Sequence, residues 1–521
     1  MSLLEQFDQL RATAYAALDS DRSSMGQYFT PVPIASLLAS MVPATTATSV
    51  SVIDPGAGVG MLSAAAVVRL ESFGVKRIDL TVCELAPEVL PALREGMTLL
   101  KEWCATKDID LEVTIIEQDF IAWAVERLAE GELFTGKPPR FDLAILNPPY
   151  KKISTSSLHR HLLRRAGLEC TNLYAAFIYL AAKALKKGGD LISINPRSFA
   201  SGPYFSDFRQ QIFTMASLQA VHLFDRRDQA FSADKVLQEN VVMHLVRGVV
   251  APTVSIMSSI AGESGNHGWK IPLERVIDPK DAKMVLHLET TEADANVSDL
   301  IRALPAKLAD IGVKVSTGRV VEFRAKEALA YVNSPDAVPL IYPQHLREAT
   351  VVWPKQTKKP DYFRPGKLHR ASLVPAGTYV LTKRFTSKEE KRRVSAFLIT
   401  TKDVSAKHYA FENHVNYFHA NGEPLDDDLA RGLAAFLNSN LVDHYFRLYN
   451  GHTQVNATDL RALPYPPAKA LRKLGQRLEG THLVNENVDQ HITELCRDYA
   501  ENEDQGSAVH AGRPGSSPRA A

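Results

Sequence analysis

The chain is poor in cysteine and has no long apolar run. Its 521 residues contain four cysteines (Cys83, Cys104, Cys170 and Cys496), and no two of them form a CxxC pair. This spacing argues against a zinc ribbon or a disulfide scaffold and fits a reducing compartment. No stretch approaches the roughly 18 apolar residues of a membrane span, and the N-terminus does not resemble an export signal. We therefore expect a cytoplasmic protein without a membrane partner.

An excess of charge of one sign is also lacking, because 60 lysines and arginines stand against 59 aspartates and glutamates. A nucleic-acid partner must therefore be met by a local basic patch, since the net charge of +1 gives no general attraction. The hydrophobic content of 45% is ordinary for a globular protein. The length is enough for roughly two to four domains with cores of their own.

From residue 50 to about residue 247, short apolar or β-branched runs alternate with stretches of helical spacing. The alternation predicts a doubly wound, Rossmann-like α/β domain with a predominantly parallel sheet, which we place at residues 1–250. Helices are expected at residues 3–18 and from Thr30-Pro31 onward. The runs are SVSVID (49–54), RIDLTVCE (77–84), EVTIIEQDF (112–120), FDLAILN (141–147), GGDLISINP (188–196), LQAVHLFD (218–225) and VVMHLVRG (241–248).

Beyond residue 250 the alternation decays into shorter, mixed segments. We expect a mixed α+β domain at 251–470, a helical segment at 471–500 and, because of its Gly, Ser, Pro and Ala content, a disordered tail at 501–521. Between Val352 and Arg393, twelve lysines and arginines stand against three acidic residues, and five aromatics are interleaved with them. Such a run is either a solvated face or a surface for nucleic acid.

A glycine-rich turn follows the first run, in VIDPGAGVGML at residues 52–62. Gly56, Gly58 and Gly60 allow the backbone to approach a ligand closely, as a nucleotide site requires. The turn is equally compatible with a simple packing loop. It is not a phosphate-cradling Walker loop, because no Gly-Lys-Ser/Thr follows.

Polar residues stand at the ends of four successive runs, namely Asp54, Glu84, Asp119 and Asn147. The carboxyl ends of strands in an open α/β sheet share one edge, so these side chains should converge. Glu84 is placed to accept hydrogen bonds from the hydroxyls of a ribose. Asp119 could accept from an adenine amino group, and Phe120 could stack on that ring. Any one of these residues could be a helix cap, but four in succession are harder to explain by capping.

Five segments occur in one order: TPVPIASLL (30–38), VIDPGAGVG (52–60), CELAP (83–87), QDF (118–120) and NPPY (147–150). The set resembles the S-adenosylmethionine-dependent DNA adenine-N6 methyltransferases of the TaqI-like and Eco57I-like class, in which a recognition domain follows the catalytic one. The resemblance covers residues 24–247. Within this range it also includes KKGGDLISINPRSF (186–199) and AFSADKVLQENVVMHL (230–245). A weaker similarity lies at residues 436–466.

The resemblance implies a Rossmann-like methyltransferase domain at 1–250 and a target-recognition domain at 251–470. It implies S-adenosylmethionine as the cofactor and double-stranded DNA as the partner, in a type II restriction-modification system. Adenine is favoured as the target base because the cytosine-N4 enzymes usually carry Ser in the place of Asn147. The residues expected at the cofactor are Thr30, Asp54, Gly56, Gly58, Glu84, Asp119 and Phe120.

The tetrapeptide Asn147-Pro148-Pro149-Tyr150 is the expected catalytic element. A base amine is a poor nucleophile, because its lone pair is delocalised into the ring. The Asn147 side-chain oxygen and the Pro148 carbonyl could accept its two protons and hold the nitrogen nearer to tetrahedral, on a backbone that the prolines make rigid. Tyr150 would stack on a base that has left the duplex. The second stacking aromatic of the family corresponds to Phe231, which could instead be a core residue.

In the recognition domain, Lys355, Arg364, Lys383 and Arg384 are expected to contact DNA, mostly at phosphates. Gln454 and Asn456 could contact adenine edges or phosphates. Their alternative role is in a turn that caps the helix after them. No metal site is expected, because the histidines are scattered.

Three alternatives remain open. The same tetrapeptide serves methyltransferases of glutamine amides and of ribosomal RNA amino groups, although those usually lack a basic-aromatic extension of this size. A non-catalytic specificity subunit would not need the intact glycine turn and strand-end residues. A fused restriction-modification protein would usually be far longer. A cognate endonuclease could be encoded nearby.

Overall fold

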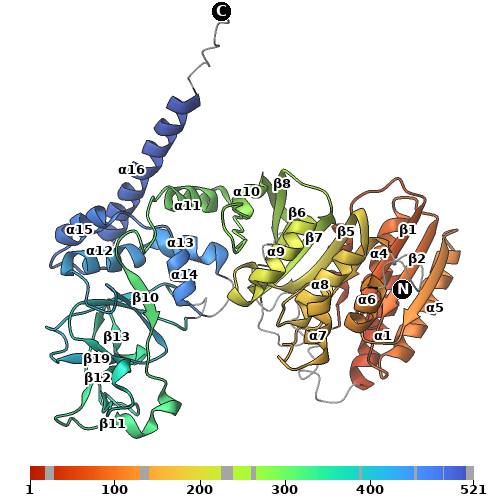
Figure 1. Cartoon of the computed structure of the whole chain (residues 1–521). Coiled ribbons are helices and arrows are strands. Elements are labelled where there is room, and N and C mark those ends of the chain that lie inside the picture. The colour runs from red at the N-terminus through yellow and green to blue at the C-terminus, as the bar shows by residue number, and fades with distance from the viewer. Residues whose placement is uncertain are drawn as a thin grey trace, which may run out of the picture. The chain divides into compact units, whose positions relative to one another are not determined.

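The computed structural model describes residues 1–17, 29–129, 140–224, 239–259, 266–386, 390–450, 454–484 and 486–511. The chain divides into two compact units, unit 1 at Met1–Thr290 and unit 2 at Thr291–Ala521 (Figure 1).

Unit 1 is built around a nine-stranded sheet in the order β3-β2-β1-β4-β5-β7-β6-β8-β9. The first five strands pair in parallel, whereas β7 runs antiparallel to both of its neighbours. All seven runs expected to form strands do so. The bounds are β1 (Ser49–Pro55), β2 (Arg77–Cys83), β3 (Asp110–Ile116), β4 (Phe141–Leu146), β5 (Leu185–Pro196), β6 (Ala216–Phe224), β7 (Asn240–Arg247), β8 (Thr253–Ser259) and β9 (Asn266–Pro272).

Helices cover both faces of this sheet, which confirms the doubly wound α/β fold. Successive residues of a strand point to opposite faces, so a strand covered on both sides is apolar throughout. In β1, Val52 enters the core beneath α1, α3, α4 and α5, and Ile53 enters the core beneath α6 to α9. The bounds are α1 (Leu3–Ala17), α3 (Val32–Ser40), α4 (Met61–Glu71), α5 (Leu90–Ala105), α6 (Phe120–Ala129), α7 (Leu158–Arg165), α8 (Leu173–Ala184), α9 (Ser206–Met215) and α10 (Leu273–Val276).

The sheet runs on past residue 250, where we expected the first domain to end. β8 pairs in parallel with β6, and β9 pairs antiparallel with β8. Unit 1 therefore ends at Thr290. The sequence of β8, TVSIMSS, is rich in small hydroxyl residues and lacks the apolar run that marks the earlier strands.

Unit 2 combines two small sheets with helices, as expected for a mixed α+β domain. The orders are β10-β20-β17-β18-β14-β13 and β11-β15-β12-β19-β16. The strands are β10 (Lys314–Thr317), β11 (Leu329–Ala330), β12 (Val338–Ile341), β13 (Leu346–Arg347), β14 (Thr350–Val351), β15 (Tyr362–Phe363), β16 (Leu373–Pro375), β17 (Tyr379–Lys383), β18 (Ala396–Ile399), β19 (His408–Phe411) and β20 (Val415–His419). The helices are α11 (Glu292–Arg302), α12 (Asp427–Leu437), α13 (Asn440–Tyr449), α14 (Ala457–Ala462), α15 (Ala468–Arg477) and α16 (Glu486–Ala511).

The C-terminal helices differ from the expected boundaries. α15 packs against α12 and so belongs to the body of unit 2. α16 continues to Ala511, into the segment 501–521 expected to be disordered, and residues 512–521 lie outside the described part of the chain. The first turns of α16 bury Val488, Ile492 and Cys496, and a helix that has been nucleated this way extends at little cost.

Among the described residues, no helix is both long and apolar enough to cross a membrane.

Candidate functional site

The glycine turn after β1 is shaped by three residues in the left-handed region. Gly56, Gly58 and Gly60 have φ values of 74°, 57° and 87°. A Cβ on Gly58 would lie 2.9 Å from the Phe29 ring, and one on Gly60 would lie 2.5 Å from Met97. A side chain at either position would therefore be strained, because φ is positive and the Cβ would crowd a neighbouring side chain. The amides of Gly56 and Ala57 donate to the carbonyl of Cys83, which ties the turn to the end of β2.

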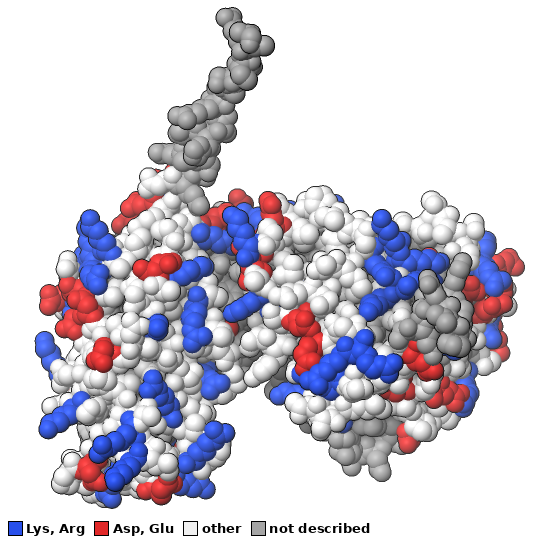
Figure 2. Space-filling model, in the orientation of Figure 1, with Lys and Arg blue, Asp and Glu red and all other residues white. Residues whose placement is uncertain are grey.

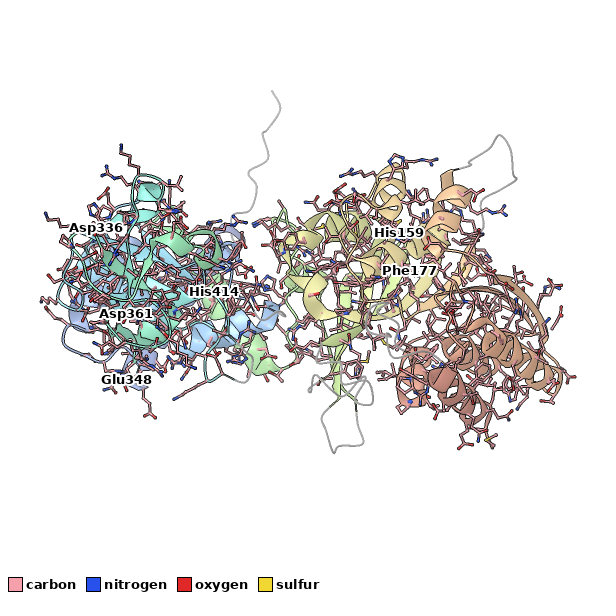
Figure 3. The ribbon with its side chains drawn as sticks, turned by 90° about the horizontal axis from the view of Figure 1, so that it is seen from below. His159, Phe177, Asp336, Glu348, Asp361 and His414 are labelled. Carbon is pink, nitrogen blue, oxygen red and sulfur yellow. The ribbon has the colours of Figure 1, made fainter. Side chains whose placement is uncertain are left out.

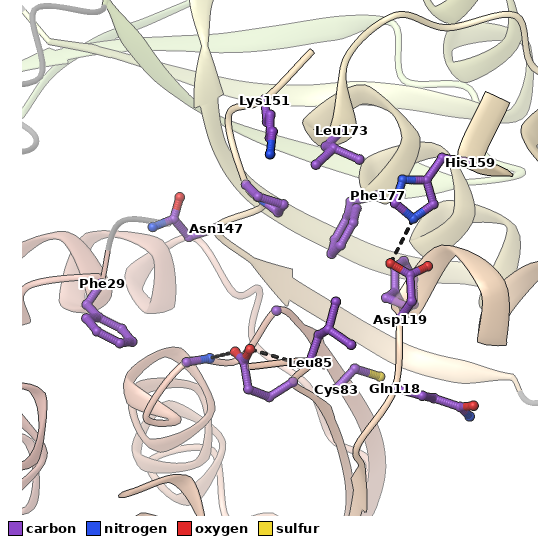
Figure 4. A pocket seen from close by; sticks show the side chains of 15 residues that line it. Phe29, Cys83, Leu85, Gln118, Asp119, Asn147, Lys151, His159, Leu173 and Phe177 are labelled. Carbon is purple, nitrogen blue, oxygen red and sulfur yellow. Dashed lines mark hydrogen bonds and ion pairs between the residues drawn. The ribbon is translucent and has the colours of Figure 1, made fainter. Parts of the chain in front are cut away.

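A cavity of about 200 Å³ opens at the carboxyl ends of β1 to β4 (Figure 4). Five of the seven residues expected at the cofactor line it, namely Gly56, Gly58, Glu84, Asp119 and Phe120. Two members of the expected catalytic tetrapeptide, Asn147 and Pro149, line it as well. The remaining lining residues are Phe29, Cys83, Leu85, Gln118, Lys151, His159, Leu173 and Phe177. Because the glycine turn forms part of the wall, it is placed for ligand approach and not only for packing.

Glu84 is fixed in place by backbone amides. One carboxylate oxygen accepts from the amide of Gly58 at 2.9 Å, and the other accepts from the amides of Leu85 and Ala86 at 2.9 and 2.8 Å. Burial raises the pKa of Glu84, and these amides offset part of that rise. The oxygen that faces Gly58 bonds one backbone amide, so it retains acceptor capacity toward the cavity. Glu84 therefore holds the loop after β2 in place and is also a preorganised acceptor.

Asp119 is paired with a histidine from α7. His159 Nε2 lies 2.9 Å from one carboxylate oxygen of Asp119 (Figure 4). The other oxygen accepts from the amide of Ala122 at 2.8 Å. Burial alone would raise the pKa of Asp119, but the His159 and backbone hydrogen bonds outweigh it and lower the pKa. The hydrogen bond to Asp119 raises the pKa of His159 in turn. Asp119 therefore presents a carboxylate to the cavity.

Asp54 lies beneath the turn and is not among the described residues that line the cavity. Its side chain is fully buried, and one carboxylate oxygen accepts from the Ser63 hydroxyl at 2.7 Å. The other oxygen has no hydrogen-bond partner among the described residues. Burial raises the pKa of Asp54 to about 7. The hydrogen bond to Ser63 ties Asp54 to the start of α4. Asp54 therefore lies near the cavity, as its place at a strand end predicts, but its side chain does not line the cavity.

Asn147 and Tyr150 contact one another at the start of the loop after β4. The Tyr150 hydroxyl donates to the Asn147 side-chain oxygen at 3.1 Å and lies 3.4 Å from the carbonyl of Ile194. The Asn147 amide nitrogen donates to the Thr30 hydroxyl at 3.2 Å. Thr30, expected at the cofactor, is not among the described residues that line the cavity. It contacts the loop after β4 instead.

The Tyr150 ring packs at the junction of both cores of unit 1 and makes an edge contact with Tyr174, with centroids 6.3 Å apart. Phe231, expected to face it across a flipped base, lies outside the described residues.

Several cavity residues were missed from the sequence. Phe29, His159, Leu173 and Phe177 reach the cavity from segments that carry no strand-end signal, and Lys151 lines it as well. Phe177, in α8, packs against Phe120 with ring centroids 4.9 Å apart. Lys151 follows the tetrapeptide directly, and this adjacency was the available signal for it.

The basic run in unit 2 is not one uniform surface. Arg393 is fully buried and donates to the Thr386 hydroxyl and to the Asn450 side chain. The Lys355 ammonium group donates to the carbonyl of Gln344 at 2.7 Å. Part of the run therefore holds unit 2 together.

The other residues expected at DNA differ in exposure. Arg364 is exposed, whereas Lys383 and Arg384 are half-buried beside the rings of Phe397 and Phe385. Gln454 and Asn456 occupy the turn before α14. The Asn456 backbone amide donates to Asp459 at 2.9 Å in a capping box, which is the alternative role considered for this turn.

The chain is similar to known proteins over almost its whole length. A model of the Eco57I restriction-modification methylase family matches residues 92–231. The type II methyltransferase M.PstI of Providencia stuartii is 40% identical over 491 residues, which cover 94% of this chain and 96% of that protein. The type II methyltransferase M.BsuBI of Bacillus subtilis is 40% identical over 500 residues, which cover 95% and 98%.

Solved structures show the same fold. The type IIL restriction-modification enzyme MmeI, determined in complex with DNA, matches with a TM-score of 0.55 at 8% identity, over 98% of this chain and 74% of that one. At this identity the match speaks for the fold alone.

Fold and site together define an S-adenosylmethionine-dependent methyltransferase. The residues fit the cofactor, because a fixed carboxylate, a glycine turn and an aromatic floor surround one cavity. The near full-length relatives define the family more closely: the chain belongs to the type II methyltransferases of restriction-modification systems.

Proposed function

We propose that the chain methylates the N6 amino group of adenine at specific sites in double-stranded DNA, as the modification enzyme of a type II restriction-modification system. The observation that carries the proposal is the position of Asn147. Its side chain lines the same cavity as Glu84 and Asp119, at the end of β4, which pairs with β1 and so lies beside the glycine turn. An acceptor for an amine is thereby held beside the expected cofactor pocket.

The cofactor supplies an electrophilic methyl group when it is bound. The Asn147 oxygen and the Pro148 carbonyl accept hydrogen bonds from the two amine protons, which directs the nitrogen lone pair toward that methyl group. The Tyr150 ring supports the base from one side. The base must be extrahelical to reach these groups, because the amine is otherwise inside the duplex.

In this proposal, unit 2 binds the DNA. The relatives M.PstI and M.BsuBI match over both units and not over unit 1 alone. This coverage favours a sequence-specific enzyme over a glutamine-amide or ribosomal RNA methyltransferase. A separate endonuclease that cuts the same site would complete the system.

The test is the position of the methyl group in DNA from a host that expresses the protein. Direct sequencing should show N6-methyladenine at one recurring site for the wild type and none for Asn147→Ala. Turnover of purified Asn147→Ala should fall by about 10²–10³-fold, the usual effect of removing one preorganised polar group. Cofactor affinity, measured by calorimetry, should remain close to that of the wild type. Methylated cytosine, or a variant with near wild-type turnover, would contradict the proposal.

A further inference from the structure

Among the large apolar side chains that unit 2 exposes, three lie on two segments that contact the same turn. Phe323, Tyr331 and Val332 are 68%, 66% and 71% exposed. Phe323 lies in a short 3-10 helix, Glu322–Arg324, while Tyr331 and Val332 directly follow β11. Single exposed apolar residues need no explanation, but a group of them on a folded surface marks a site of interaction.

A basic turn joins these side chains into one surface. The Tyr331 hydroxyl lies 3.4 Å from the carbonyl of Lys358, and Lys359 forms an ion pair with Glu322. The Arg324 guanidinium group lies 5.3 Å from the centroid of the Phe323 ring. We call Phe323, Arg324, Tyr331, Val332 and the turn Gln356–Lys359 the recognition surface. Lysines and arginines predominate on the face of unit 2 shown in Figure 2, around the position of β11 and β12 in Figure 1.

The turn is held rigidly by a buried carboxylate beneath it. Asp361 is 4% exposed, and its side chain accepts from the backbone amides of Lys355 and Gln356 at 3.2 and 2.8 Å (Figure 3). His345 Nε2 lies 2.8 Å from the other Asp361 oxygen. His345 Nδ1 accepts from the amide of Tyr342 at 3.0 Å, so Nε2 carries the proton and donates to Asp361.

Gln344 makes further contacts with this turn. Gln344 accepts from the Lys355 ammonium group and from the Thr357 hydroxyl, at 2.7 and 2.9 Å. Gln356 and Lys358 are exposed at the tip. Gln356 has a φ of 51°, which strains a residue other than glycine and persists only where the surroundings impose it. A strained, anchored and exposed glutamine is the kind of outlier that indicates function.

We propose that the recognition surface contacts the bases of duplex DNA and contributes to site selection. The inference rests on the proposed function and goes beyond it by locating base contacts in unit 2.

Phosphates can be held by flexible cations, whereas base edges require polar groups in fixed positions. A glutamine amide is suited to the paired donor and acceptor of an adenine edge. Exposed aromatic and branched side chains suit thymine methyl groups or the faces of base steps. The surrounding lysines and Arg324 complement the charge of DNA.

The experiment uses the full-length protein and a library of duplexes with randomised sequence, with methylated positions found by sequencing. Gln356→Ala should relax site preference at one or two positions by about tenfold, within the 1–3 kcal/mol of a bidentate base contact, without changing the salt dependence of DNA binding. Lys358→Ala should lower the salt slope by about one unit and leave site preference unchanged. Tyr331→Ala should weaken binding to the preferred site more than binding to other duplexes.

Tyr204→Ala is the matched control, because Tyr204 is a 76% exposed tyrosine in unit 1. Melting curves for each variant confirm that it folds. If the wild type methylates no DNA, the proposed function fails. If the wild type methylates a preferred site and both Gln356→Ala and Tyr331→Ala keep its preference and affinity, only the recognition surface is wrong. A change in oligomeric state without a change in site preference would also overturn it, because the surface would then dock a second copy of the chain.

Discussion

Asn147 is held at both ends of its side-chain amide. Thr30 accepts from the nitrogen, and the Tyr150 hydroxyl donates to the oxygen. These two contacts hold the plane of the amide, and in this arrangement its oxygen faces the Tyr150 hydroxyl. The oxygen that the proposed mechanism requires is thus set in orientation before a base arrives. Thr30 is then a positioning residue that acts through Asn147.

Thr30→Val tests that role, because it keeps the shape of the side chain and removes the acceptor. Turnover should fall by about tenfold, the effect of one lost hydrogen bond, while the calorimetric affinity for S-adenosylmethionine stays near that of the wild type. Thr30→Ser should restore turnover. A Thr30→Val variant with weakened cofactor binding and unchanged turnover would return Thr30 to the cofactor, as the family resemblance implied.

Glu84→Gln should weaken S-adenosylmethionine binding by about tenfold or more, because a charge-assisted acceptor for the ribose hydroxyls is lost. The new amide group would also oppose the backbone amides that Glu84 now satisfies. Calorimetry on the purified protein measures the loss. Glu88→Gln, at an exposed position nearby, is the control. Equal affinities for the two variants would show that Glu84 only holds the loop between β2 and α5 in place.

The sequence predicted the residues of the site that follow from strand order. Glu84, Asp119 and Asn147 were found because parallel strands end at one edge. His159 and Phe177 were not, because they approach the cavity through the packing of α7 and α8, which leaves no periodic trace in the sequence. Asp54 shows the limit of the rule: it stands at a strand end, but its side chain lies beneath the turn.

Among the secondary-structure elements, α12 and α15 approach each other through two glycines. A Cβ on Gly432 would lie 1.9 Å from the carbonyl oxygen of Leu471, and one on Gly475 would lie 1.9 Å from that of Asp428. The backbones are therefore in direct contact, and the two helices cannot move apart without losing the packing around them.

Gly475→Ala should destabilise the protein by about 1–3 kcal/mol, as overpacking of a filled core does. The sign of the change in the free energy of unfolding is informative, because Gly→Ala in a helix usually stabilises a protein by up to about 1 kcal/mol. Denaturant unfolding of the full chain measures the change, with Lys473→Ala on the exposed face of α15 as the control. An unchanged or raised stability would show that the two helices have room to separate.

The elements that sequence reasoning found are those with long apolar runs. β1 to β7 have seven or more residues, apart from β4 with six, and the runs of the central strands β1, β4 and β5 are covered on both faces. The strands of unit 2 have two to five residues, too few for a period to emerge. Their positions depend on contacts with distant segments, so only the mixed character of unit 2 could be predicted.

At the scale of the whole molecule, buried histidines link stability to pH. Burial lowers the pKa of His222, in β6, from its ordinary value of 6.5 to about 4. Burial also lowers the pKa values of His345 and His419 in unit 2. Each of these groups favours folding while it is neutral. Their contribution is complete above about pH 6.5 and is lost as the pH falls through the folded pKa.

His222→Asn isolates one of these contributions. The free energy of unfolding of the wild type should lose of the order of 3 kcal/mol relative to the variant between about pH 6.5 and pH 4. The comparison is made between variants because Asp54 and Glu84 have raised pKa values and act in the opposite direction. Denaturant titrations at several pH values measure it. Parallel stability curves for the two proteins would show that His222 is protonated without cost in the fold.

The support beneath the Gln356–Lys359 turn has a practical consequence for redesign. Its shape is encoded by two separate stretches, since Gln344 and His345 are as much a part of it as Asp361. A graft that transplants only the tip into a relative would leave the backbone amides of Lys355 and Gln356 without their acceptor. Chimaeras designed to alter site choice should therefore exchange residues 342–361 as one cassette, so that Gln344, His345 and Asp361 are transferred together with the turn that they support.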